Sequence, residues 1–333
     1  MNVGVLGYGY WGPNLVRNFM QKEGITVFGL ADLREDRLKI ANKSFRGILL
    51  TREANDLLTH PEIDTIVIAT PASTHYAFAK KAIENGKHVL VEKPLATKNE
   101  EVAELFALAE KHGLKLMVDY TFLYTGSVQK IKKTLQNQDF GQIHYIDSTR
   151  INLGVFQYDT NVLWDLATHD LSIIYHLIDE RPYQVQAIGA AHMGNGVENI
   201  AYVTLRYRSG LIVHLNCSWA SPVKIRKMII GGDKKMIIYD DIEPTDKLKI
   251  YDYGYSMITD EYRRNALVDY RLGDVSIPKF SLQEALAGLV DDFYNVVANN
   301  GTPLCSPQLS IDVTRTLIAA EQSLKQDGQM VAL

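Results

Sequence analysis

The feature that most constrains this chain is a glycine-rich turn directly after its first apolar run. Residues 7–12 read GYGYWG and follow the strand-like run Val3–Leu6. A first glycine permits a tight strand-to-helix turn, a second lets the backbone approach a pyrophosphate, and a third lets helix and strand pack closely. The amide groups and the dipole of the following helix then hold the phosphates. The predicted cofactor contacts in this turn are Gly7, Gly9, Tyr10, Trp11 and Gly12.

An acidic residue stands where the next strand is expected to end. Asp32 lies about 20 residues after Gly12, the spacing at which a carboxylate meets the adenosine ribose of a dinucleotide. Such a carboxylate accepts hydrogen bonds from both ribose hydroxyls and repels a 2′-phosphate, so the pattern favours NAD over NADP. Arg34, two residues on, would weaken that preference. The alternative is a glycine turn that serves packing alone, with Asp32 as a surface residue.

Apolar runs alternate with helical patterns over the first third of the chain. The runs are Val3–Leu6, Ile25–Ala31, Thr65–Ala69, His88–Val91 and Leu114–Val118. Gly86 and Gly113 stand where left-handed residues would close helices, and Thr97 with Glu100 fits a capping box. Strands that alternate with helices indicate βαβ units and a parallel sheet covered on both faces. We therefore expect an α/β, Rossmann-type dinucleotide-binding domain over residues 1–119.

After Tyr120 the strand-like runs follow one another directly. They are Ile143–Ile151, Val185–Ala191, Ala201–Tyr207, Leu211–Trp219, Lys227–Gly231 and Met236–Tyr239. One helical pattern, Val162–Ile178, interrupts them, and a capping box of Ser281 and Glu284 precedes a late helix. Consecutive strands imply a mostly antiparallel sheet. We expect a second, α+β domain with a large sheet over residues 120–333.

Composition excludes several classes of protein. Apolar residues make up 46 % and charged residues 22 % of the 333 residues, close to a globular average. The formal net charge of −4 is a poor match for nucleic-acid binding. No run approaches the ~18 apolar residues of a membrane helix, and the N-terminus does not resemble a signal peptide. Two cysteines, Cys217 and Cys305, are too few for a disulfide framework or a cysteine zinc site, so we expect a reduced, cytoplasmic location.

Charged and polar residues end two further strands of the expected parallel sheet. Glu92 and Lys93 follow the run that begins at His88, and the loop after Thr65–Ala69 reads TPASTH. Ligands of open α/β sheets bind outside the carboxyl ends of the strands, so Lys93 should point towards the cofactor. The alternatives are a solvated loop lysine and, for His75, local packing at a helix start. The predicted cofactor contacts here are Thr70, Pro71, His75, Glu92 and Lys93.

Asp165 and His169 lie four residues apart in the segment WDLATHD and therefore share one face of a helix. A carboxylate at this spacing can orient a histidine and stabilise its protonated form, while the imidazole takes a hydroxyl proton. A pair of this kind is more often structural when it stands alone, and metal binding is a competing use. No third ligand has suitable spacing, so no metal site is predicted. Together with Lys93, the pair indicates acid–base catalysis.

The order of GYGYWG, Asp32, IATPASTH, VEKP and WDLATHD resembles the glucose–fructose oxidoreductase / inositol dehydrogenase family over essentially the whole chain. Within it, GYGYWGPNLVRNF and WDLATHDLSI are similar to the nucleotide-sugar 3-dehydrogenase-like branch. The resemblance implies that Lys93 hydrogen-bonds the reacting oxygen, that His169 is the acid/base and that Asp165 supports it. It also implies a cis peptide bond before Pro94. The second domain would then bind substrate and form homodimers or homotetramers through its sheet.

Two positions depart from the pattern of that family. Many members carry an aspartate three residues after the histidine, where this chain has Ser172 and carries Asp170 instead. Many also carry an arginine where this chain has Leu123. Both differences bear on substrate shape more than on hydride transfer. The expected substrate contacts are Lys93, Tyr124, Arg150, Asn161 and His169, and surface or packing roles are the alternative for the middle three.

The sequence predicts an NAD-dependent oxidoreductase, with NADP less favoured, that acts on a secondary alcohol of a sugar. The expected substrate is a small molecule, a nucleotide-linked hexose of the UDP-N-acetylglucosamine type that is oxidised at carbon 3. A 3-ketoreductase and a dehydrogenase of inositol or a free sugar are alternatives within the same class. A non-catalytic NAD-binding regulatory protein is an alternative from another class. The presence of Lys93, Asp165 and His169 together argues against it, because a pure binder has little need of all three.

Overall fold

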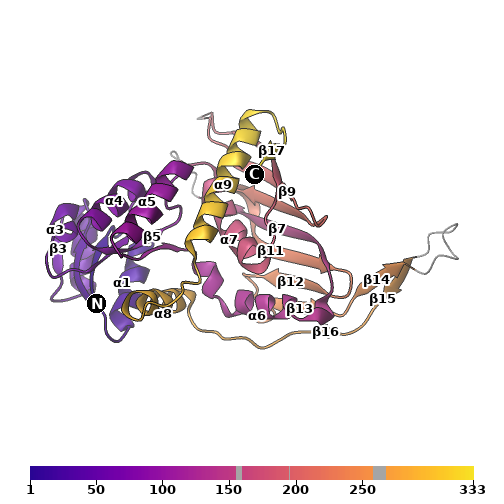
Figure 1. Ribbon diagram of the computed structural model, residues 1–333, viewed down its shortest axis with the longest axis horizontal. Helices are drawn as coiled ribbons and strands as arrows, with labels where there is room; N and C mark the ends of the chain where they lie inside the picture. Colours follow the sequence, from indigo (N-terminus) through magenta and orange to yellow (C-terminus); the bar gives the residue numbers. More distant parts are fainter. Residues whose placement is uncertain (155–159, 195, 258–267) are drawn as a thin grey trace. The chain divides into compact units, whose positions relative to one another are not determined.

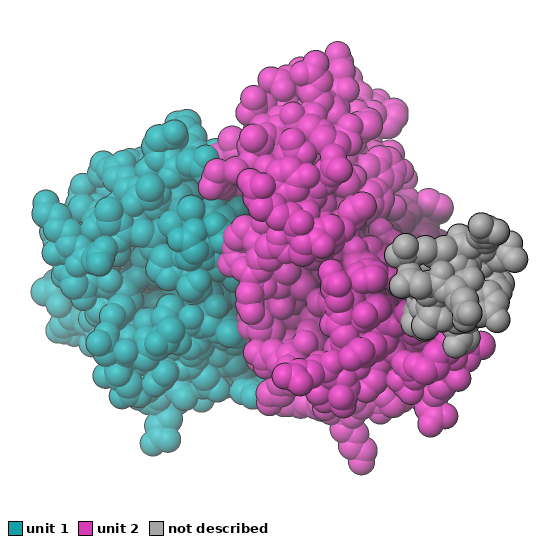
Figure 2. Space-filling view, turned by 45° about the vertical axis from the view of Figure 1, so that its right-hand side comes forward, with its two compact units in different colours: residues 1–125, 283–314 teal, residues 126–282, 315–333 magenta. Residues whose placement is uncertain are grey.

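The computed structural model describes residues 1–154, 160–194, 196–257 and 268–333. They form two compact units, coloured teal and magenta in Figure 2. The first unit comprises residues 1–125 and 283–314, and the second comprises residues 126–282 and 315–333. The first unit is thus built from two stretches of chain rather than from the N-terminal stretch alone.

In the described part of the first unit, six parallel strands form one sheet in the order β3-β2-β1-β4-β5-β6. Their bounds are β1 Asn2–Leu6, β2 Thr26–Ala31, β3 Leu49–Thr51, β4 Thr65–Ile68, β5 His88–Glu92 and β6 Leu116–Asp119. All of β4 is buried, as expected of a parallel strand covered on both faces. The order reverses between β1 and β4, and such a switch point is where these folds bind nucleotides. The prediction of a parallel Rossmann sheet is confirmed.

Six α-helices of the described residues lie wholly in this unit. They are α1 Gly12–Gln21, α2 Glu35–Ser44, α3 Ala54–Leu58, α4 His75–Glu84, α5 Asn99–Lys111 and α8 Ala285–Ala298. Helix α1 buries Leu15, Val16 and Phe19. The Phe19 ring meets the Phe293 ring of α8 edge to face, with 6.3 Å between centroids. This contact explains why a helix from the C-terminal part of the chain joins the N-terminal unit.

The helix ends test the local signals in the sequence. Gly86 and Gly113 adopt φ angles of +73° and +67° after α4 and α5, as predicted. Both capping-box predictions are wrong, because no side chain caps α5 or α8. Helix α5 begins at Asn99, too late for Thr97 to cap it. The carboxylate of Glu284 instead accepts two hydrogen bonds from Arg17, at 2.6 and 2.9 Å, a long-range ion pair that replaces the local cap.

Nine strands of the described residues form the sheet of the second unit, in the order β16-β13-β12-β11-β7-β10-β9-β8-β17. Their bounds are β7 Ile143–Leu153, β8 Gln184–Ala190, β9 Ile200–Arg206, β10 Ile212–Ser218, β11 Ala220–Gly232, β12 Met236–Asp240, β13 Leu248–Tyr251, β16 Val275–Ser276 and β17 Val331–Ala332. Neighbouring strands are antiparallel except β7 and β10, which are parallel. A separate hairpin pairs β14 Gly254–Met257 with β15 Val268–Arg271. The expected large, mostly antiparallel sheet is confirmed.

The helices of the second unit lie on one side of this sheet (Figure 1). They are α6 Gly126–Leu135, α7 Thr168–Leu177 and the second half of α9 Pro307–Lys325. The Ser323 hydroxyl of α9 accepts a hydrogen bond from the Ala187 amide of β8 at 2.9 Å. On the other side, Ile188 and Tyr202 are 58 % and 47 % exposed. No helix in the described ranges is long and apolar enough to cross a membrane.

Candidate active site

The glycine turn after β1 has the geometry that its three glycines predict. Gly7 has a φ angle of +95°, and a Cβ atom there would lie 2.4 Å from the Ala69 carbonyl oxygen. A Cβ on Gly12 would lie 2.4 Å from the Gly7 carbonyl oxygen. At Gly9 the nearest atom to such a Cβ is Arg34 Nη2, 3.8 Å away, so space beside this backbone is open. Two glycines therefore close the turn, and the third leaves the approach that a pyrophosphate needs.

Asp32 lies buried at the end of β2, next to this turn. Its carboxylate accepts hydrogen bonds from the Tyr8 amide at 2.7 Å and from Arg34 Nε and Nη2 at 3.1 and 3.2 Å. Burial alone would raise the pKa of Asp32, but the hydrogen bonds from Arg34 and Tyr8 outweigh it and lower that pKa. Asp32 and Arg34, the two residues that the sequence places near the cofactor ribose, thus form one ion pair.

Tyr10 and Trp11 occupy the exposed part of the turn before α1 begins. Their side chains are 85 % and 42 % exposed, and their rings stand nearly perpendicular with 5.3 Å between centroids. Neither ring belongs to the core of the unit, so both remain available for the contacts proposed from the sequence.

The loop after β4 meets the glycine turn at the switch point of the sheet. Pro71 is exposed, and the Thr70 hydroxyl lies 2.7 Å from the Thr74 hydroxyl. His75 is buried, with Nδ1 2.7 Å from the Pro94 carbonyl oxygen and Nε2 2.9 Å from the Thr70 carbonyl oxygen. Its ring therefore ties the loop after β4 to the loop after β5. An effect of His75 on a cofactor would pass through these loops rather than through direct contact.

Lys93 directly follows β5, at the same edge of the sheet as the glycine turn. The Lys93–Pro94 peptide bond is cis, as the resemblance implies. Glu92, the last residue of β5, is the register partner of Asp119, the last residue of β6. Two carboxyl groups thus end neighbouring strands beside the lysine.

Tyr124 ends the short 3-10 helix η2 Thr121–Tyr124, and its hydroxyl is directed at α8. It donates to Asp292 Oδ2 at 2.6 Å and lies 3.4 Å from Cys305 Sγ. Asp292 also accepts the Leu304 amide at 2.9 Å. Burial raises the pKa of Tyr124, so the hydroxyl stays protonated as a donor. The arrangement holds η2 against the C-terminal stretch of the first unit. The Tyr124 hydroxyl, which the sequence predicts to contact substrate, is bound to Asp292 instead.

In the second unit, a π-helical turn at Leu163–Ala167 leads into α7. Such turns are frequent at functional sites. Asp165 lies within the turn and accepts a hydrogen bond from Trp219 Nε1 at 2.9 Å. His169 is the second residue of α7, and its carbonyl oxygen accepts the Ser172 hydroxyl at 2.7 Å. Trp219, at the end of the strand-like run that the sequence marks, therefore anchors the carboxylate that precedes the histidine.

The side chains of Arg150 and Asn161 also hydrogen-bond other groups of the second unit. Arg150 on β7 is 4 % exposed, and its Nε and Nη2 donate to the Asp170 carboxylate at 2.8 and 2.9 Å. Asp170 is the residue that stands beside His169 in place of the family's aspartate at Ser172. Asn161 Oδ1 accepts the amides of residues 163 and 164 at 3.2 and 3.4 Å, so it caps the π-helical turn. Both side chains hold α7 and the π-helical turn before it in place.

Replacement of Asp170 by alanine is expected to destabilise the second unit strongly. It removes both hydrogen bonds from a buried guanidinium, and breaking a buried ion pair costs about 3–5 kcal/mol. Urea denaturation at matched protein concentration measures this change. Asp246→Ala, which removes the exposed pair with Lys249, is the control and should leave unfolding almost unchanged. Equal stability of the two variants would contradict the structural role of Asp170.

Three residues of this arrangement escape sequence reasoning: Asp119, Asp292 and Trp219. Asp119 ends a strand at the ligand-binding edge, so its position carries a signal that strand-end reasoning could have found. The partners of Asp292 and Trp219 lie 168 and 54 residues away, at Tyr124 and Asp165, and no local pattern shows those contacts.

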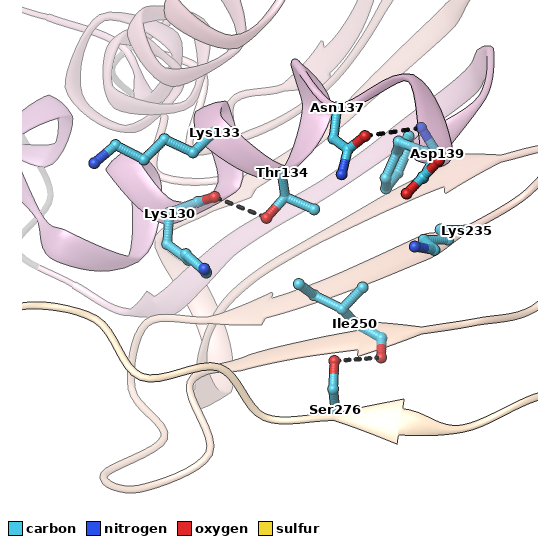
Figure 3. Close-up of a pocket in the computed structure, with 9 residues that line it drawn as sticks. Lys130, Lys133, Thr134, Asn137, Asp139, Lys235, Ile250 and Ser276 are labelled. Atoms are coloured by element: carbon cyan, nitrogen blue, oxygen red, sulfur yellow. Dashed lines mark hydrogen bonds between the residues drawn. The ribbon is translucent and has the colours of Figure 1, made fainter.

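A pocket of about 250 Å³ lies in the second unit between α6 and the edge of the sheet (Figure 3). Three lysines line it: Lys130 and Lys133 from α6, and Lys235 from the residue before β12. The Thr134 hydroxyl donates to the Lys130 carbonyl oxygen at 2.9 Å, and the Ser276 hydroxyl to the Ile250 carbonyl oxygen at 3.4 Å. None of the residues that the sequence predicts for catalysis or binding lines this pocket.

Comparison with protein families gives two matches along the chain. The family described as "Oxidoreductase family, NAD-binding Rossmann fold" matches residues 1–120. The "GFO/IDH/MocA C-terminal domain" matches residues 128–238. The first match spans the whole parallel sheet, and the second runs from within α6 to within β12, short of β13, β16 and β17.

Individual relatives include several dehydrogenases. The UDP-N-acetylglucosamine 3-dehydrogenase of Acidithiobacillus ferrooxidans is 27 % identical over 264 residues, 78 % of each chain. The myo-inositol 2-dehydrogenase of Thermotoga maritima is 21 % identical over 249 residues, 72 % of each chain. The solved structure of the Acidithiobacillus enzyme GnnA has a TM-score of 0.81 at 22 % identity and covers 99 % of both chains. GenD2 from gentamicin A biosynthesis, in complex with NAD, has a TM-score of 0.84 at 21 % identity and covers 100 % of this chain and 96 % of its own. These structures show the same fold.

Proposed function

The chain belongs to the GFO/IDH/MocA family of NAD-binding oxidoreductases, and from this premise we propose that it oxidises carbon 3 of a nucleotide-linked hexose. The observation that carries the proposal is the strand-end lysine, Lys93, at the same edge of the sheet as a glycine turn shaped for a pyrophosphate. The substrate class is supported by the similarity to the UDP-N-acetylglucosamine 3-dehydrogenase over 78 % of each chain. A dehydrogenase of free inositol is the second candidate, because a myo-inositol 2-dehydrogenase matches over a similar share.

The first unit would hold NAD through its glycine turn. The backbone at Gly9 and the amides that open α1 suit the pyrophosphate, and Asp32 suits the adenosine ribose. Bound NAD supplies the acceptor for the hydride, while the protein supplies position and electrostatics. Thr70, Pro71 and Glu92 line the same edge of the sheet.

Acid–base chemistry would be divided between two side chains. The Lys93 ammonium donates a hydrogen bond to the reacting oxygen and stabilises the negative charge that develops there. The His169 imidazole takes the hydroxyl proton, with Asp165 placed one helical turn before it. Because Tyr124, Arg150 and Asn161 are engaged by other protein groups, we propose that they shape the site rather than contact substrate.

The substrate proposal is tested by comparing kcat/KM for nucleotide-linked hexoses with kcat/KM for myo-inositol and free glucose. We expect at least one UDP-, GDP- or dTDP-hexose to exceed every free sugar. A higher value for myo-inositol would favour the second candidate. Faster turnover of a keto-sugar with NADH would make the enzyme a 3-ketoreductase in its working direction.

Replacement of Asp32 by alanine is expected to weaken NAD binding and to relax discrimination against NADP. The change removes the ribose acceptor and frees the half-exposed Arg34 guanidinium for a 2′-phosphate. Since a hydrogen bond to a charged group contributes about 1.5–3 kcal/mol, the ratio of NAD to NADP affinities should fall roughly tenfold or more. Calorimetric titration with each cofactor measures the ratio.

Asp32→Asn is the matched control, because its amide oxygen still accepts the Tyr8 amide that holds the turn. It should shift cofactor preference in the same direction with less loss of overall affinity. An unchanged ratio in both variants would show that Asp32 does not read the ribose.

We also propose that the open face of the nine-stranded sheet binds a second copy of the chain. Ile188 lies opposite Tyr202, and Ile212 lies opposite Tyr145, so two pairs of exposed apolar side chains lie on this face. Exposed apolar side chains gathered on one face of a sheet favour association. The protein would then be a homodimer, or a homotetramer with a further interface. As a location we propose the cytoplasm, which fits the two buried free thiols.

A charge on this face is expected to dissociate the oligomer. Tyr202→Asp replaces one of these apolar side chains by a carboxylate, which burial against a partner would leave unpaired. Sedimentation analysis should show an oligomer for the parent protein and a monomer for the variant. Ile242→Asp, which charges an equally exposed apolar residue away from β8, β9 and β10, should stay oligomeric. A monomeric parent protein at micromolar concentration would contradict the proposal.

A further inference from the structure

Glu92 and Asp119 end neighbouring parallel strands and are register partners. Side chains at paired positions of adjacent strands lie on the same face of the sheet. Asp119 is only 2 % exposed, and Glu92 is partly buried. Two carboxylates this close and this poorly solvated repel each other, so both cannot ionise readily.

The hydrogen bonds of Asp119 show where a proton is needed. Its Oδ1 accepts the Thr121 hydroxyl. Its Oδ2 is buried, and no protein group of the described residues donates a conventional hydrogen bond to it. The Glu92 carboxyl, on the register partner of Asp119, interacts with the Asp119 carboxyl. A carboxylate only accepts, so a hydrogen bond between two carboxyl groups requires that one of them be protonated.

The pKa values of the two carboxyl groups also indicate that one of them is protonated. Burial and the charge of Asp119 raise the pKa of Glu92 well above its usual range. Burial also raises the pKa of Asp119, to about 6, although its hydrogen bonds with Thr121 and Glu92 oppose the rise. The nearby Lys93 ammonium lowers both values without cancelling the rise. The Cys305 thiol that also faces Asp119 has a pKa raised to about 12 by burial and is neutral.

We propose that Glu92 and Asp119 share one proton at neutral pH and act together as a single negative charge behind Lys93. They are then positioning residues for the lysine, a role that rests on the proposed function of Lys93. Two ionised carboxylates would attract the ammonium twice as strongly as one, and two neutral ones would exert no such attraction. One shared proton leaves one negative charge to balance one positive charge.

The shared proton is tested directly by infrared spectroscopy of the whole protein at pH 7.5. A protonated carboxyl group has a carbonyl stretching band that ionised carboxylates lack. We expect this band in the parent protein and its loss in both Glu92→Gln and Asp119→Asn. In each variant the new amide donates to the remaining carboxylate, which no longer needs the proton.

The background for this band is favourable. Every other described carboxyl group whose pKa departs from its ordinary value has a lowered one and is ionised at pH 7.5. These groups are Asp32, Glu35, Glu104, Glu180, Asp252 and Glu284. Absence of the band from the parent protein would overturn the proposal. A band that persists in Asp119→Asn would mean that burial alone protonates Glu92, and would overturn the sharing of the proton.

The positioning role is tested by pH profiles of kcat/KM. At pH 8 each single variant retains one negative charge, so its kcat/KM should exceed that of the variant that retains none. The double variant Glu92→Gln/Asp119→Asn has none and should lose about tenfold or more, as expected for the loss of a charged hydrogen-bonding partner. Equal rates for the double variant and the parent protein would overturn the role.

Acidification separates this role from a structural one. Below about pH 6 the parent pair takes up its second proton and loses its charge. The accompanying fall in kcat/KM should move to lower pH in both single variants. A profile that does not move would count against the pair. Because the infrared band needs no turnover, it still tests the shared proton if no nucleotide sugar is a substrate.

Discussion

Replacement of Lys93 by alanine is expected to lower turnover at least about 100-fold in a protein that still folds and binds NAD. The lysine directly follows β5. Among the described residues, its ammonium is the one positive charge that lowers the pKa values of both Glu92 and Asp119. A donor aimed at developing charge commonly makes a large contribution to catalysis, and positioned acid–base groups contribute roughly 10²–10⁴-fold. The measurement is kcat with saturating NAD and sugar substrate.

The matched control for this variant is Lys98→Ala. Lys98 lies five residues further on, is exposed and pairs with Glu101 at 2.7 Å. Its removal also deletes one positive charge from the same region and should leave kcat nearly unchanged. If the Lys93 and Lys98 variants turned over equally fast, Lys93 would not act on the reacting oxygen.

His169→Ala is expected to have an effect of similar size, about 100-fold or more on kcat. The histidine is the second residue of α7, after a π-helical turn whose Asp165 is anchored by Trp219. Without the imidazole, the hydroxyl proton has no positioned base to accept it. Added imidazole should restore part of the rate in this variant, which a purely structural loss would not allow.

His176→Gln serves as the control on the same helix. His176 lies two turns along α7, and its Nε2 is 3.4 Å from Gln129 Nε2, so it has a packing environment of its own. This variant should keep the turnover of the parent protein and gain nothing from imidazole. Near-normal turnover in His169→Ala would remove the histidine from the mechanism.

Local signals account for most of what the sequence predicts correctly about the fold. The parallel sheet follows from apolar runs at βαβ spacing, and Gly86 and Gly113 close their helices as expected. Strand β3 is missed because it has three residues at the edge of the sheet, too few to form an apolar run. The capping boxes fail where the helix starts later than the motif suggests, and Glu284 pairs with Arg17, 267 residues away.

In the candidate site, too, the sequence predicts local structure correctly and misses long-range contacts. Gly7, Gly9 and Gly12 have the geometry that their spacing predicts, because a turn is a local structure. Arg150 shows the limit of that reasoning, since an arginine suited to a diphosphate is instead buried against Asp170. Whether a polar side chain meets a ligand or another part of the chain depends on contacts between distant segments, which composition and periodicity do not record.

The central claim is NAD-dependent oxidation of a nucleotide-linked hexose, and NADH absorbance tests it most directly. The purified protein is incubated with NAD and UDP-, GDP- and dTDP-hexoses, beside myo-inositol and free glucose, with Lys93→Ala in parallel. The account predicts NADH from at least one nucleotide sugar with the parent protein and almost none with the variant. Binding of NAD without turnover of any nucleotide sugar, in either direction, would contradict it.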